Sequence, residues 1–159
     1  MAEKSQGLPS QPADPARVVE IARRWIGTPY CHQASIPGVG TDCLGLIRGI
    51  WRELLGREPV FVPPYSPDWS EASGDERQRR AAECYLLPAA SNAQPEPGDM
   101  ILFRMRDGRV AKHLGVAAER SGSPSFIHAY SGHSVVESAL TDAWRKRIVA
   151  RFVFPQGVR

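Results

Sequence analysis

The chain has 159 residues, a length typical of one domain that buries a hydrophobic core without disulfide or metal support. A formal net charge of +3 favours acidic partners without naming one. Three cysteines are too few for a disulfide framework and predict folding in a reducing compartment. No window approaches the roughly 18 apolar residues of a membrane helix, and the polar N-terminus lacks a secretory h-region. We therefore expect synthesis in the cytoplasm without a signal peptide, and no membrane partner.

The N-terminal third of the chain is expected to contain a tail, a helix and a turn-rich segment. Residues 1–13 are polar and rich in proline and serine, which predicts a disordered tail before a single domain over residues 14–159. The first helix is expected to begin after Asp14, a favourable N-cap, and to end near Gly27, a favourable stop. Prolines and glycines then indicate turns over residues 28–41.

Two more helices are expected before the pattern changes. Residues 42–55 have apolar side chains at helical spacing, and Asp42 is a suitable N-cap for them. Residues 57–70 are rich in proline and aromatic residues, which indicates a long ordered loop. A third helix is predicted over residues 74–87, with Cys84 on its inward face.

After residue 99 the apolar pattern alternates, which indicates strands. The predicted strands cover residues 100–103, 110–118, 126–130, 135–138 and 148–154. Helices come first and strands follow, so the order predicts an α+β fold in which N-terminal helices pack on a C-terminal antiparallel β-sheet or barrel.

Cys43 falls in the first turn of the second predicted helix. Unpaired backbone N–H groups and the positive end of the helix dipole favour an anion in this position. A cysteine is a nucleophile only as its thiolate, and the pKa of a free thiol is roughly 8.5. The helix start therefore suits a nucleophilic cysteine, although Cys43 on its own is better explained as a buried structural thiol.

Two histidines in neighbouring predicted strands can complete a site around Cys43. His113 can act as a base that takes the thiol proton and returns it to a leaving amine. If the two strands pair as a hairpin, His128 can lie beside His113 and hold it in one tautomer. Singly, each histidine also fits a strand end or a core position. His133, in a Ser-Gly-His-Ser turn, is the alternative third member if His128 points elsewhere.

Five segments follow one another in an order that is more specific than any one of them. They are Trp25-Ile-Gly-Thr-Pro-Tyr30, Thr41-Asp-Cys-Leu-Gly-Leu46, Pro97-Gly-Asp-Met-Ile-Leu-Phe103, His113-Leu-Gly-Val116 and Phe126-Ile-His-Ala129. Together they resemble the motifs of the NlpC/P60 peptidases, from about residue 16 to 154. The resemblance implies a papain-like fold and a cysteine peptidase that hydrolyses bacterial peptidoglycan stem peptides without a cofactor or metal.

The same resemblance implies roles for individual residues. Cys43 would be the nucleophile, His113 the base and His128 the third polar member. Tyr30 matches a family tyrosine beside the active site that assists the oxyanion hole or the substrate. Asp42 matches the acidic residue before the nucleophile, which is implicated in gripping a substrate amine. The bond expected to be cleaved joins D-glutamate to diaminopimelate.

One branch of the family resembles the chain more than the others. Leu44 departs from the serine that commonly follows the nucleophile in exported members. Residues 30–35 and 42–49, with Trp51, look instead like phage and gene-transfer-agent cell-wall peptidases. This resemblance implies phage-like tail proteins as partners and delivery by such a particle to the periplasm or cell wall. The departure at Leu44 leaves the cleaved bond less defined than the reaction class.

Other functions have less support in the sequence. A metal site built from Cys31, His32 and Cys43 lacks the ligand spacing of a zinc finger or ribbon. His32 is instead expected at the rim of the active site, in contact with substrate. The basic runs 77–80 and 145–147 contain few aromatics, so we expect no nucleic-acid partner. Two alternatives stay open: an amidase or acyltransferase on the same scaffold, and a non-catalytic tail structural protein.

Overall fold

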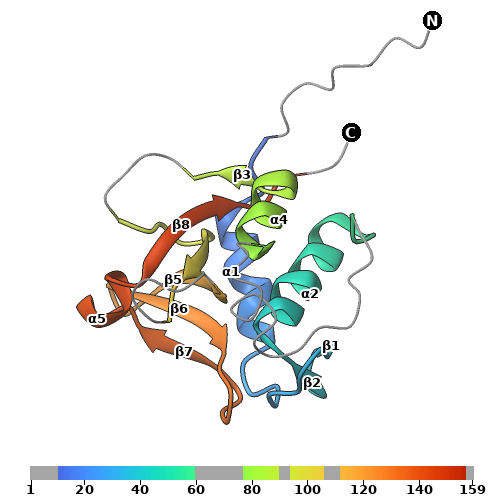
Figure 1. The fold of residues 1–159 in the computed structure, drawn as a ribbon, viewed down its shortest axis with the longest axis horizontal. Coiled ribbons are helices and arrows are strands. Elements are labelled where there is room, and N and C mark those ends of the chain that lie inside the picture. Colours follow the sequence, from blue (N-terminus) through green and yellow to red (C-terminus); the bar gives the residue numbers. More distant parts are fainter. Residues whose placement is uncertain (1–10, 60–76, 90–93, 106–111, 157–159) are drawn as a thin grey trace, which may run out of the picture.

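The computed structural model describes residues 11–59, 77–89, 94–105 and 112–156. It combines helices with a six-stranded sheet, which confirms the predicted α+β class (Figure 1). In chain order the elements are α1 (Pro15–Arg24), β1 (Ser35–Ile36), β2 (Gly40–Thr41), α2 (Cys43–Leu55), α4 (Arg77–Tyr85), β3 (Leu87–Pro88), β4 (Met100–Phe103), β5 (His113–Arg120), β6 (Ser123–Ala129), β7 (Val135–Ala139), α5 (Asp142–Arg145) and β8 (Ile148–Val153). No described helix is both long and apolar enough to cross a membrane.

The large sheet has the strand order β3-β8-β4-β5-β6-β7, and all of its neighbouring strands are antiparallel. Alternate residues of β4 enter two different cores. Met100 and Leu102 join the core that the sheet forms with α1 and α2, whereas Ile101 and Phe103 pack on the other face with Trp144 of α5. The two central strands, β4 and β5, are therefore covered on both sides.

Helices α1 and α2 approach each other closely. Asp14 caps α1 by accepting a hydrogen bond from the Ala16 N–H, as its position before Pro15 predicts. Gly49 of α2 lies against Trp25, so closely that a Cβ at Gly49 would be 2.0 Å from the indole Cζ2. The absence of a side chain at Gly49 thus fixes how α2, and with it Cys43, sits against the first helix.

Two segments near the N-terminus have structure that the sequence did not predict. Residues 12 and 13, which were expected in the tail, contact the C-terminal end of the described chain: Pro12 pairs with Pro155, and the Ala13 N–H donates to the Phe154 carbonyl at 2.8 Å. Residues 1–10 lie outside the described part. Residues 28–41 contain a short hairpin, β1–β2, in which Ser35 pairs with Thr41.

Cys84 was expected to face the core, and this is wrong. The buried residues of this region are Gln78, Ala82 and Leu86, four apart on one face, so Cys84 lies on another face and is exposed. Helix α4 ends at Tyr85 rather than at residue 87. Most of the loop expected over residues 57–70 and the start of the helix expected at residue 74 lie outside the described residues.

Candidate active site

Cys43 is the first residue of α2, and the residue before it caps the helix. Asp42 Oδ1 accepts a hydrogen bond from the Gly45 N–H at 2.7 Å, and its Oδ2 accepts one from the Gln33 N–H at 2.8 Å. The residue is only 2% exposed. Asp42 therefore ties the segment before β1 to the first turn of α2, and it acts on Cys43 through its charge and the backbone it fixes.

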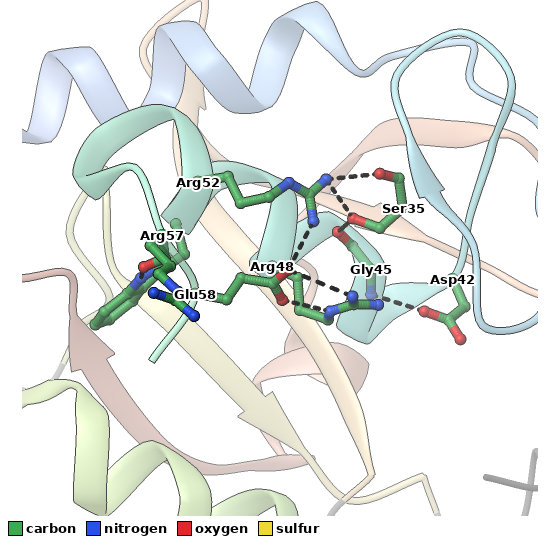
Figure 2. A network of polar contacts seen from close by, with 8 residues as sticks. Ser35, Asp42, Gly45, Arg48, Arg52, Arg57 and Glu58 are labelled. Carbon is green, nitrogen blue, oxygen red and sulfur yellow. Dashed lines mark hydrogen bonds and ion pairs between the residues drawn. The ribbon is translucent and has the colours of Figure 1, made fainter. Parts of the chain in front are cut away.

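A second set of polar contacts holds β1 and the segment after α2 to helix α2 itself (Figure 2). The Ser35 hydroxyl donates to the Gly45 carbonyl at 2.6 Å. Arg52 donates to both the carbonyl and the hydroxyl oxygen of Ser35, at 2.6 and 2.8 Å. Glu58 pairs with Arg48 at 2.6 Å and with Arg52 at 3.3 Å. The sequence analysis did not predict this cluster. The feature that could have indicated it is the spacing of Arg48 and Arg52, which lie four residues apart and therefore on one face of the helix.

The Cys43 thiol is half-buried against the start of β5. Its Sγ lies 3.7 Å from the Lys112 carbonyl oxygen. Burial, followed by the negative charge of Asp42, raises the pKa of Cys43 to about 12, although backbone N–H groups, including that of Leu114, act in the opposite direction. The sulfur thus touches the backbone on either side of His113, and it rests as a neutral thiol.

His113 and His128 lie together, as the sequence predicts. The Nε2 of His113 is 2.8 Å from the Nδ1 of His128. Gly115 lets β5 and β6 pack closely beside the two histidines, because a Cβ at Gly115 would be 3.1 Å from the Phe126 ring and 3.4 Å from the His128 Cβ. Burial is the first cause that lowers the pKa of His113, to about 3, and that of His128, to about 4. Both rings are therefore neutral near pH 7.

His128 has a second polar partner that sequence reasoning missed. Its Nε2 lies 2.9 Å from the Ser138 hydroxyl oxygen on β7. His133 is exposed, and its N–H donates to the Tyr130 carbonyl at 2.9 Å. Of the two candidate third members, it is therefore His128 that contacts His113.

Aromatic side chains surround the histidine pair on the face that carries α5. The Trp144 ring lies 5.9 Å from the His113 ring and 5.5 Å from the His128 ring, measured between centroids. Phe126 lies closer to His128, at 4.2 Å. These rings keep water from the histidines, which is the physical origin of their low pKa values.

Tyr30 and His32 each contact one of the two residues that precede Cys43. Tyr30 pairs with Thr41, two residues before Cys43, through a parallel bridge. Burial, and then the negative forms of Cys43 and Asp42, raise the pKa of Tyr30 to about 12, so its hydroxyl remains a hydrogen-bond donor. The Nδ1 of His32 is 3.8 Å from Asp42 Oδ2, and its side chain is 31% exposed. Both lie beside the residues that fix Cys43.

The described residues include no group of three or more histidine, cysteine or acidic side chains that could hold a metal ion. The Nε2 of His113 and the Nδ1 of His128 are hydrogen-bonded to each other, so this pair of nitrogens is already engaged. The described part of the site instead contains a thiol beside the backbone that flanks His113, a pair of neutral imidazoles, and backbone N–H groups at a helix start. These are the kinds of group that nucleophilic catalysis and stabilisation of an oxyanion use.

A family model, that of the NlpC/P60 family, matches residues 27–153. The chain therefore belongs to the NlpC/P60 family. The papain-like α+β fold expected from the sequence is confirmed by a solved structure, the NlpC/p60 domain of peptidoglycan hydrolase SagA. That domain superposes with a TM-score of 0.56 at 22% identity, over 89% of this chain and 98% of the domain.

Two relatives with assigned names match most of the chain. Gamma-DL-glutamyl hydrolase of Bacillus subtilis (strain 168) is 30% identical over 141 residues, which cover 86% of this chain and 29% of the relative. Murein DD-endopeptidase MepH of Escherichia coli (strain K12) is 27% identical over 141 residues, which cover 84% of this chain and 44% of the relative. The chain thus spans less than half the length of either relative.

Proposed function

We propose that the protein is a cysteine peptidase that hydrolyses peptidoglycan stem peptides, with Cys43 as its nucleophile. The observation that carries the proposal is the placement of the Cys43 sulfur, at a helix start and against the backbone that flanks His113. His113 is in turn held by His128 at 2.8 Å. Family membership and the names of both relatives support hydrolysis of cell-wall or glutamyl peptides as the reaction class.

In the proposed mechanism the reaction begins from a neutral thiol and a neutral imidazole. Because His128 occupies the Nε2 of His113, the Nδ1 is the nitrogen that takes the Cys43 proton as the sulfur attacks the substrate carbonyl carbon. The carbonyl oxygen becomes an oxyanion, which the Cys43 N–H and the Tyr30 hydroxyl stabilise as donors.

The tetrahedral intermediate then collapses. The C–N bond breaks, the imidazolium of His113 returns its proton to the leaving amine, and a thioester to Cys43 remains. Water attacks this thioester with His113 as the base, which releases the new carboxyl end and restores the thiol. An amine in place of water would make the same site an acyltransferase.

We further propose that the scissile bond joins D-glutamate to diaminopimelate. The sequence resemblance supports this bond, and so does the name of the Bacillus relative, which describes a gamma-DL-glutamyl hydrolase. The name of the Escherichia relative describes a DD-endopeptidase, so fragment masses must decide between the two. Tyr30 and His32 are proposed to line the substrate side of the site, and Asp42 to add the negative charge that attracts a substrate amine.

Delivery is proposed to occur as part of a phage-like or gene-transfer-agent tail, with action in the periplasm or cell wall. The resemblance of residues 30–35 and 42–49 to that branch supports this proposal. Proteomic analysis of purified particles tests it: the protein should co-sediment with tail proteins. Its recovery only in the unassembled fraction would contradict the proposal.

Digestion of purified peptidoglycan that contains diaminopimelate tests the activity. Wild type should create new ends at D-glutamate, whereas Cys43→Ala should create none. Amine acceptors offered in the same digest separate the two reactions, because hydrolysis alone leaves them unmodified. Equal inertness of both proteins, with both assembled into tails, would favour a structural role instead.

A further inference from the structure

Ser138 contacts the histidine pair but is not one of the three residues, Cys43, His113 and His128, to which catalytic roles are assigned. Its hydroxyl oxygen lies 2.9 Å from the Nε2 of His128. In the ladder between β6 and β7, His128 pairs with Val136 and Phe126 pairs with Ser138. Residues two apart on a strand face the same side, so Ser138 is the diagonal neighbour of His128 on that side of the sheet. The register of one hairpin therefore brings the hydroxyl to the ring.

Two imidazole rings and one hydroxyl group thus form a single chain of hydrogen bonds, which runs from His113 through His128 to Ser138. A neutral imidazole has one N–H and one acceptor nitrogen, so the direction of one bond fixes the direction of the next. The Phe126 ring, 4.2 Å from the His128 ring, limits rotation of the middle member. The chain can point only two ways.

We propose that Ser138 is a positioning residue that accepts the Nε2–H of His128 and thereby sets the tautomer of His113. With that proton on Nε2, the Nδ1 of His128 accepts the Nε2–H of His113, and the Nδ1 of His113 is left free to take a proton. The opposite direction would put the only proton of His113 on its Nδ1, where it could not act as a base toward Cys43.

The surroundings leave the pair little other freedom. Both histidines are buried, at 7% and 2% exposure, so water does not readily replace a missing partner. Without the serine hydroxyl, the Nε2 of His128 would lose this partner in both tautomers. A buried N–H without an acceptor is tolerated less well than a buried acceptor without a donor, so the tautomer of His128 with its proton on Nδ1 would gain in population. The inference rests on the proposed function for its effect on rate, but its effect on the tautomer does not depend on any activity.

Ser138→Thr and Ser138→Val form a matched pair for the test, because the two side chains have the same shape and differ in the hydroxyl. Circular dichroism and thermal unfolding confirm that each variant is folded. Nitrogen-15 NMR of histidine-labelled protein then reports which ring nitrogen of His128 and His113 is protonated. The chain has four histidines, so single replacements can assign the signals.

We expect wild type and Ser138→Thr to show the Nε2–H form of both rings, and Ser138→Val to show a mixture that includes the Nδ1–H form. Cleavage of a stem peptide should fall about tenfold in kcat for Ser138→Val and recover in Ser138→Thr. Identical tautomers in the two variants, or an Nδ1–H form of His128 in wild type, would overturn the inference. An inactive wild type with the expected tautomers would count against the proposed function alone.

Discussion

The resting state of Cys43 leads to a prediction about its alkylation. Iodoacetamide reacts with the thiolate, and a pKa of about 12 leaves about one molecule in 10⁵ as thiolate at pH 7. A free cysteine with a pKa of roughly 8.5 has about one in 30, so Cys43 has about 3,000-fold less thiolate. A more basic thiolate is also more nucleophilic, by about 40-fold over this difference in pKa. Cys43 should therefore react about a hundredfold more slowly than a free cysteine.

The measurement uses a Cys31→Ser, Cys84→Ser background, because both of these thiols are exposed. An unstructured peptide with one cysteine serves as the reference, and Cys43→Ala in the same background gives the blank. The rate at Cys43 should rise tenfold per pH unit and continue to rise above pH 9, where the peptide levels off. A rate that is flat between pH 5 and 8, and that His113→Gln abolishes, would demonstrate a thiolate–imidazolium pair and refute the reasoning.

Three further predictions concern stability and local order. Burial lowers the pKa of His113 to about 3 and that of His128 to about 4, below the ordinary 6.5, so protons bind the unfolded chain first. Stability should therefore fall as the pH drops below 6.5, by about 2 kcal/mol per histidine between pH 7 and 5. Urea unfolding measures the loss, His128→Gln should remove about half of it, and equal stability at both pH values would contradict the account. Gly49→Ala should destabilise the wild-type protein by about 1–3 kcal/mol, because its Cβ would meet the Trp25 indole. The same substitution made in a Trp25→Phe background should cost little, because phenylalanine lacks the clashing indole atoms. Equal melting-temperature shifts in both backgrounds would exclude the clash. Arg52→Met should speed amide exchange in β1 by about tenfold with a smaller effect on global unfolding, and unchanged exchange in β1 would show that the arginine does not hold it.

The features that sequence reasoning predicted are those that local patterns specify. An N-cap aspartate followed by an apolar stripe places Cys43 at a helix start, and the structure has α2 begin at that residue. Alternating apolar residues predict the strands of His113 and His128, and a short connection between them predicts a hairpin. Their contact follows from these local features, although the catalytic roles of the three residues stay predictions.

The features that were missed depend on register and on distant contacts. Ser138 reaches His128 only because β7 pairs with β6 in one register, which no local pattern specifies. The second oxygen of Asp42 holds Gln33, nine residues away, through a loop conformation that the sequence does not reveal. Cys84 was misplaced because a short, charged helix has a weak apolar period, so its inward face depends on which neighbours it packs against.

The central claim is that Cys43 forms a covalent acyl-enzyme, and a rapid-quench experiment tests it directly. Protein in the Cys31→Ser, Cys84→Ser background is mixed with a stem peptide that contains diaminopimelate, quenched in acid within milliseconds, and analysed as intact protein and as peptides by mass spectrometry. The account predicts a transient mass increase equal to the part of the stem peptide that ends in D-glutamate, located on Cys43 and absent from Cys43→Ala. Cleavage of the stem peptide by Cys43→Ala at the wild-type rate would contradict it.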